Sequence, residues 1–178
     1  TGYATAGSLA AVAYSGACIE NITSSVVVSQ SANKVGDSIG GIIGKVDEIS
    51  TTVNIIIRNC TFNGTVYARN YVGGIVGSAN AVKATNQTPV IIENCTNNGN
   101  INASSSIGGI AGVLFQTSLV YDCVNTGVIS SYYTSGKTVY ADQDIGSSSA
   151  NPRLGYIVGW ASDTAAKCKV TFYIDGKT

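Results

Sequence analysis

The ionisable side chains of this 178-residue chain limit the chemistry it could perform. No histidine is present, which excludes a Ser-His-Asp or Cys-His nucleophilic site and a His-Glu-x-x-His zinc site. Carboxylates remain as candidate catalytic or metal-binding groups, because paired acids can hydrolyse glycosides or bind calcium. Asp142 and Asp144 form a local pair whose side chains would share one face of a strand. One isolated pair does not support an enzyme. We therefore interpret it as part of a solvated loop with the capacity for calcium, and predict no catalytic residue and no other cofactor or metal.

Tyrosines form the second group of residues that could contact a ligand. Tyr132, Tyr133 and Tyr140 lie in the same segment as the acid pair, and Tyr67 and Tyr71 flank a Gly-Gly phrase. Exposed aromatic rings stack on sugars and anchor protein contacts, whereas the alternative is that some rings simply cover strand ends. The three tyrosines of that segment and the acid pair are our candidate contacts for a glycan or protein partner.

Composition excludes several classes of partner. Charged residues make up 11% of the chain, and ten basic residues balance ten acidic ones. Binding to nucleic acid or to an anionic membrane surface needs clustered Lys and Arg, so we expect neither. No apolar run reaches the length of a transmembrane helix. Hydrophobic residues make up 44%, which is typical of a folded chain.

A phrase with three glycines recurs along the chain. It reads Ile-Gly-Gly-Ile-Ile-Gly at 39–44, Val-Gly-Gly-Ile-Val-Gly at 72–77 and Ile-Gly-Gly-Ile-Ala-Gly at 107–112, with a degenerate copy at 154–159. Successive full copies begin 33 and then 35 residues apart. Such self-similarity is the sequence signature of a repeat architecture.

A second phrase recurs between the glycine phrases. Residues 57–66, 92–101 and 120–129 align, and each copy places a cysteine directly after Asn or Asp. Cys60 and Cys95 each precede the first glycine of the next Gly-Gly pair by 13 residues. This fixed spacing indicates that both phrases belong to one structural unit.

The repeats predict an all-β fold, because short β-branched runs alternate with Asn, Gly and Ser clusters. No unit could bury an apolar face alone, so the units must stack with equivalent residues above one another. We predict a right-handed parallel β-helix, a β-solenoid of about four to five coils, in which paired glycines allow close backbone approach and Asn side chains bond between copies. The structural repeat positions are Gly40, Gly41, Gly73, Gly74, Gly108, Gly109, Asn59, Asn94, Cys60, Cys95 and Cys123.

The repeat places three of the five cysteines in one column. Cys60, Cys95 and Cys123 are predicted to be stacked, buried and free, because a disulfide between adjacent rungs has poor geometry. Lying on different coils without Cys-x-x-Cys spacing, they do not suggest a metal site. The odd total leaves at least one thiol without a partner in the chain.

The two phrases together resemble the GLUG-motif repeat of bacterial surface and secreted proteins over roughly residues 35–158. Such repeats occur in adhesins of gut bacteria and in IgA-cleaving metallopeptidases outside their catalytic part. The resemblance implies extracellular display on a bacterial cell surface and a structural or adhesive role. Two features depart from the pattern, namely the broken glycine pair at Leu154-Gly155-Tyr156 and an insertion at 130–152.

We expect a single β-solenoid domain over 1–178, with clear repeats at 35–129, the insertion at 130–152 and a degenerate final coil at 153–178, where Trp160 would cap the last coil. An open β-helix exposes unpaired strand edges, so we expect a section of a longer protein or end-to-end association of copies. The favoured function is a non-enzymatic stalk or adhesin whose loops contact a glycan or protein. The alternative is a carbohydrate-active β-helix enzyme with clustered carboxylates.

Overall fold

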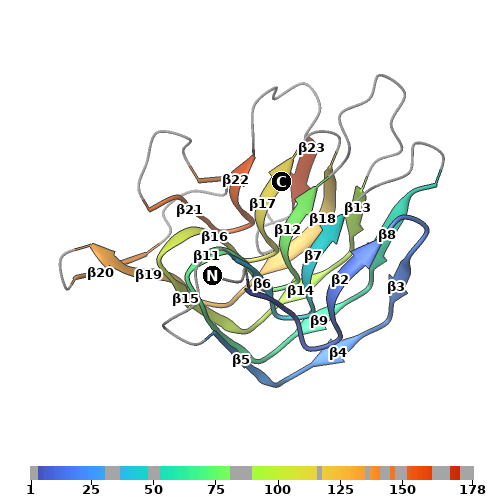
Figure 1. The fold of residues 1–178 in the computed structure, drawn as a ribbon. Coiled ribbons are helices and arrows are strands. Elements are labelled where there is room, and N and C mark those ends of the chain that lie inside the picture. The colour runs from blue at the N-terminus through green and yellow to red at the C-terminus, as the bar shows by residue number, and fades with distance from the viewer. Residues whose placement is uncertain are drawn as a thin grey trace.

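The computed structural model is a parallel β-solenoid of about five coils (Figure 1). It describes residues 4–30, 37–47, 53–80, 90–115, 118–134, 137–140, 145–146, 152–161 and 169–172, with backbone alone for 37, 133–134, 137–140 and 169–172. Every described pairing between coils is parallel. The predicted parallel β-helix is therefore confirmed.

Two sheets are built from the strands on either side of the glycine phrase. Sheet A contains β1 (Ala4–Ala6), β6 (Asp37–Gly40), β11 (Asn70–Gly73), β16 (Ser105–Gly108) and β21 (Leu154–Gly155). Sheet B contains β2 (Ala10–Tyr14), β7 (Ile43–Asp47), β12 (Val76–Asn80), β17 (Ala111–Phe115) and β22 (Val158–Ala161). Figure 1 shows the strands of sheet B side by side across the molecule.

The remaining strands form three further walls. Sheet C contains β3 (Cys18–Glu20), β8 (Ile55–Arg58), β13 (Val90–Glu93), β18 (Leu119–Asn125) and β23 (Lys169–Phe172). Sheet D contains β4 (Thr23–Ser24), β9 (Thr61–Phe62) and β14 (Thr96–Asn97), and joins sheet C through the long strand β18. Sheet E contains β5 (Val27–Ser29), β10 (Thr65–Tyr67), β15 (Asn100–Ala103), β19 (Ile129–Thr134) and β20 (Lys137–Tyr140).

The core is a set of columns that run along the solenoid. In sheet A, Ile39, Val72, Ile107 and Leu154 lie opposite one another on successive strands and are buried. Sheet E contributes Val28, Val66, Ile101 and Ile129 in the same way. Each fully buried Ile or Val stabilises the fold by about 1.5–3 kcal/mol, so the in-register stack provides the main stabilisation.

The glycine phrase allows backbone to contact backbone, as its spacing predicts. A Cβ on Gly40 would lie 2.8 Å from the carbonyl carbon of Ile43, so the first glycine permits the tight arc between sheets A and B. The second glycine lies against side chains of sheet D: a Cβ on Gly41 would come within 2.6 Å of the Phe62 ring, and one on Gly74 within 2.6 Å of Asn97 Oδ1.

The third glycine of the phrase is equally constrained, although the sequence analysis gave it no role of its own. A Cβ on Gly77 would lie 2.6 Å from the backbone carbon of Ser38, which belongs to sheet A of the preceding coil. Gly112 and Gly159 lie in the same way against the backbone next to Val72 and Ile107. Sheets A and B are therefore pressed together backbone to backbone along the whole solenoid.

The corner between sheets C and D depends on asparagine. Asn21, Asn59, Asn94 and Asp122 have φ angles of 60°, 54°, 51° and 48°, so every copy of this position adopts the left-handed conformation that Asn and Asp tolerate well. Asn59 Nδ2 also donates to Asn21 Oδ1 at 3.4 Å. The predicted Asn contacts between coils are shorter at the next corner, where Asn98 Nδ2 donates to Asn63 Oδ1 at 2.8 Å.

We predict that Gly74→Ala destabilises the protein by roughly 3 kcal/mol, because the new Cβ would meet the Gly109 carbonyl oxygen and Asn97 Oδ1 in a packed interior. Gly16→Ala is the matched control, because the nearest atom would be a Val53 methyl at 3.5 Å and only the φ of +83° penalises it, by about 1 kcal/mol. Urea unfolding of both variants measures the difference. Equal losses would contradict the backbone-contact role of Gly74.

Candidate binding surface

The outer face of sheet E presents an exposed tyrosine. Val66 of β10 points into the core, so its neighbour Tyr67 points outward, and its side chain is 52% exposed. Ser29 and Asn102 lie opposite Tyr67 on the adjacent strands β5 and β15. This part of the face is uncharged, and the exposed Arg69 follows two residues further on.

A second exposed tyrosine reaches the same face from two coils away. Tyr132 of β19 is 52% exposed, and its Oη donates a hydrogen bond to the Ala68 carbonyl at 2.7 Å. Because β15 lies between β10 and β19, the Tyr132 side chain spans one whole coil and ends beside the residue that follows Tyr67. The two strands that carry these rings are about 10 Å apart, two rung spacings.

Strand β15, which lies between the two ring-bearing strands, presents two asparagines: Asn102 at the level of Tyr67 and Asn100 two residues earlier, opposite Thr65. Asn102 is opposite Tyr67 on one side and Ser130 on the other, and its Oδ1 is buried without a hydrogen-bond partner. Buried polar atoms without a partner are uncommon in native proteins. The exposed Asn100 accepts a hydrogen bond at Oδ1 from the Val128 amide, which leaves its amide group for other contacts. We define Tyr67, Asn100, Asn102 and Tyr132 as the tyrosine face.

The other predicted contact residues lie on the hairpin beside this face or outside the described residues. Tyr133 belongs to β19 and Tyr140 to β20, which pairs antiparallel with β19 so that Tyr140 is opposite Ser130. Their side chains, and the whole of Asp142 and Asp144, are outside the described residues. Ser130 and Ser131, the first residues of the predicted insertion, continue the coil in register with Asn102 and Ala103.

Two other aromatic residues are used in packing. Tyr71 has a φ of 46° and meets the Phe115 ring edge-on at 6.4 Å between centroids. Trp160, expected as a cap on the last coil, instead packs edge-on against Phe115 of the preceding coil at 5.9 Å, with the Arg153 guanidinium 4.3 Å from its ring centroid. Of the two tyrosines that flank the second glycine phrase, only Tyr67 is therefore mainly exposed. The alternation of inward and outward side chains along β10, with Val66 inward and Tyr67 outward, is the sequence signal that could have predicted this difference.

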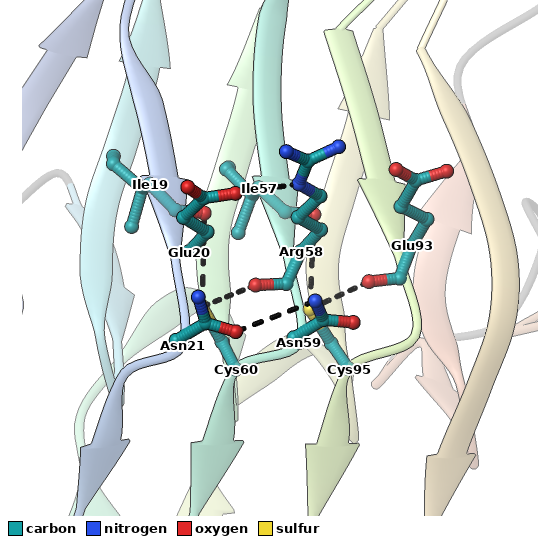
Figure 2. Close-up of polar contacts among 9 residues, drawn as sticks. All are labelled: Ile19, Glu20, Asn21, Ile57, Arg58, Asn59, Cys60, Glu93 and Cys95. Atoms are coloured by element: carbon teal, nitrogen blue, oxygen red, sulfur yellow. Dashed lines mark hydrogen bonds and ion pairs between the residues drawn. The ribbon is translucent and has the colours of Figure 1, made fainter.

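Two carboxylates in the described part of the chain, Glu20 and Asp47, have side-chain partners. Glu20 accepts a hydrogen bond from Arg58 Nε at 2.7 Å, and this bond raises the pKa of Arg58 (Figure 2). Asp47 bonds Lys45 Nζ at 2.9 Å and Asn80 Nδ2 at 3.1 Å, so it bridges two coils. Among the described residues, no three His, Cys, Asp or Glu side chains are close enough together to hold a metal ion.

Three stacked cysteines, Cys60, Cys95 and Cys123, which we call the thiol column, lie just inside the asparagine corner between sheets C and D. Cys60, Cys95 and Cys123 are buried and free, as predicted, and each donates to the carbonyl two residues earlier, at 3.2, 3.3 and 3.1 Å. Figure 2 shows Cys60 and Cys95 side by side behind Asn21 and Asn59. The hydrogen bond with Cys123, together with burial, raises the pKa of Cys95 to about 12. The hydrogen bond with Cys95 and burial raise the pKa of Cys60 further. Such thiols are poor nucleophiles, because the thiolate is the reactive form.

Comparison of the chain with models of protein families, with curated proteins and with solved structures gave no match. Within the described residues, no helix has the length and apolar character needed to cross a membrane.

The thiol column predicts alkaline sensitivity. A thiol with a raised pKa keeps its proton in the folded state, so its contribution to stability is intact below its ordinary pKa of 9.0 and is lost as the pH rises toward about 12. We expect the free energy of unfolding to fall by roughly 1 kcal/mol per pH unit for each such thiol across this window. Urea titrations at several pH values measure it.

The control is Cys95→Ala, which removes one thiol and leaves every other ionisable side chain in the sequence. Its pH profile should be shallower than that of the wild type. An identical slope would show that the column does not titrate in this way.

Proposed function

We propose that this chain is a non-enzymatic module of a bacterial surface or secreted protein that binds a glycan through the tyrosine face. The observation that carries the proposal is the pair of half-exposed rings, Tyr67 and Tyr132, held two strands apart on sheet E of the solenoid. Aromatic rings stack on the apolar faces of sugars, and amide groups between them can bond to sugar hydroxyls.

The fixed position of Tyr132 supports this assignment. Its hydroxyl is bonded to the Ala68 carbonyl, so the ring is held in one orientation before any ligand arrives. Holding a contact residue in its bound geometry reduces the ordering cost of association. The exposed Asn100 on the neighbouring strand β15 has its amide group available for a sugar hydroxyl, because its Oδ1 is used by the Val128 amide.

The proposed location on the outside of a bacterial cell comes from the likeness to GLUG-motif repeats. The balanced charge of the chain fits a surface module that binds neutral glycans, because such a module needs no attraction for phosphate groups. A protein partner would be contacted through the tyrosine face and the adjacent β19–β20 hairpin. We favour a glycan because the four residues of the tyrosine face are uncharged and present hydroxyls and amides.

The described carboxylates support a module in preference to a carbohydrate-active enzyme. Glu20 and Asp47 each bond a basic residue, and Asp122 occupies the left-handed corner, so they support the scaffold. Asp142 and Asp144 keep the enzyme as the alternative. If glycans are cleaved and Asp144→Asn abolishes the turnover, the enzyme replaces our proposal.

The proposal is tested on a glycan array, followed by titration calorimetry with the glycans that bind. We expect Tyr67→Ala to weaken binding roughly 5- to 30-fold, because one stacked ring contributes on the order of 1–2 kcal/mol. Tyr132→Phe should weaken it less, since the ring stays but the bond that holds it is lost.

Tyr14→Ala is the matched control, because Tyr14 is 53% exposed but lies on sheet B, away from the tyrosine face. It should bind as the wild type does. Equal affinity of Tyr67→Ala and wild type would exclude this face as the binding site.

A further inference from the structure

The segment between the fourth and fifth coils ends in a dipeptide that imitates the glycine phrase. Ile145 pairs in parallel with Val158 of β22, and the Gly146 amide donates to the Val158 carbonyl at 2.9 Å. Gly146 is buried. Because β22 is the last strand of sheet B, the dipeptide lies where a sixth strand of that sheet would lie.

Its glycine also makes the contacts of the third glycine in each repeat. A Cβ on Gly77 would meet the carbonyl oxygen of Gly44 and the backbone nitrogen of Ile39, one coil earlier. A Cβ on Gly146 would meet the carbonyl oxygen of Gly159 and the backbone nitrogen of Leu154 at 2.9 Å. The same pair of backbone contacts recurs, one rung further along the solenoid.

The same segment covers a second strand edge. Strand β20 pairs with β19, the last parallel strand of sheet E, but it runs antiparallel. Figure 1 shows β20 beside β19 at the margin of the molecule. The antiparallel strand occupies the edge of sheet E that a further parallel coil would use. Strand β20 and the Ile145–Gly146 dipeptide therefore lie on the edges of two sheets, E and B.

The opposite end has no such cover in the described part of the chain. Strands β1 to β5 each pair on one side only, with the second coil. Inward-facing side chains of this first coil, Ala4, Ala6, Ala17, Ile19 and Ile22, are only partly buried. This end combines unpaired backbone groups with apolar side chains, which is a template for strand addition.

We propose that strand β20 and the Ile145–Gly146 dipeptide together form an end cap that prevents a second copy of this chain from adding its first coil to the last one. The two ends match in sheets A and B, because the first and the last coil pair with their neighbours at the same residues of the glycine phrase. Addition of a first coil to a last coil is head-to-tail, so without a cap it would repeat and form filaments. The proposal is independent of glycan binding.

The test is Gly146→Val, whose side chain would collide with the backbone of Gly159 and Leu154 and displace the cap. We expect the wild type to remain monomeric in analytical ultracentrifugation and the variant to form filaments visible by electron microscopy. Val139→Pro is a second variant, which disrupts β20 opposite Ser131 and leaves the solenoid body unchanged. Wild-type filaments, or two variants that stay monomeric with the cap displaced, would overturn the proposal.

Two controls separate cap loss from general destabilisation. Ile75→Ala removes core packing at a fully buried residue far from the cap, and it should lower stability without forming filaments. The double variant Ile22→Lys with Gly146→Val places a charge inside the open first coil, and it should stay monomeric because head-to-tail contact would bury that charge. If the double variant assembles as readily as Gly146→Val, association is not head-to-tail and the proposal is wrong.

Hydrogen exchange shows whether the cap is closed in the wild type. The Gly146 amide is bonded to Val158, so it should exchange slowly in the wild type and quickly in Val139→Pro if the cap opens as one unit. Fast exchange of Gly146 in the wild type would show that the dipeptide does not hold the edge, which would also overturn the proposal.

Discussion

The fold depends on the direct contact between the backbones of sheets A and B. Gly77, Gly112 and Gly159 each lie against sheet A of the preceding coil, at distances that no side chain could enter. This contact fixes the height of one coil relative to the next, because a slip of one residue would bring a Cβ to the contact. Because the coils are continuous, the remaining sheets pair in the register that this contact sets. Buried columns such as Ile39, Val72 and Ile107 therefore run along the solenoid.

Stacking also determines how the polar residues are used. Equivalent positions lie one rung apart, so a polar residue that recurs can bond to its own copy, as Asn98 does with Asn63. Charges in the described coils follow the same rule: Glu20 meets Arg58, and Asp47 meets Asn80. Among the described carboxylates, Glu20 and Asp47 are thus engaged in the scaffold. The two rings of the proposed tyrosine face, Tyr67 and Tyr132, are instead each 52% exposed.

The solenoid is asymmetric along its length. One end has unpaired strands and half-buried apolar side chains, whereas the other carries β20 and the Ile145–Gly146 dipeptide. The strand that leads into this cap, β19, also holds Tyr132, so the proposed binding face and the proposed cap share one strand. A ligand that immobilises Tyr132 would therefore also restrict the strand on which β20 is paired. The two proposals thus place recognition and closure of the last coil on one strand, β19.

The sequence by itself determined the parallel β-helix, the stacked glycines and asparagines, and the buried free thiols, because a strict repeat leaves one way to stack equivalent residues. The left-handed conformation of the Asn corner was seen only in the structure. The sequence also identified Tyr67 and Tyr132 as aromatic residues of interest. Only the tertiary structure decided that Tyr71 and Trp160 pack on Phe115 while Tyr67 stays exposed. These contacts join residues of different coils that lie outside the repeated phrases, so no sequence pattern predicts them. The same holds for Ile145–Gly146, a two-residue copy too short to recognise until the backbone of Gly159 is seen beside it.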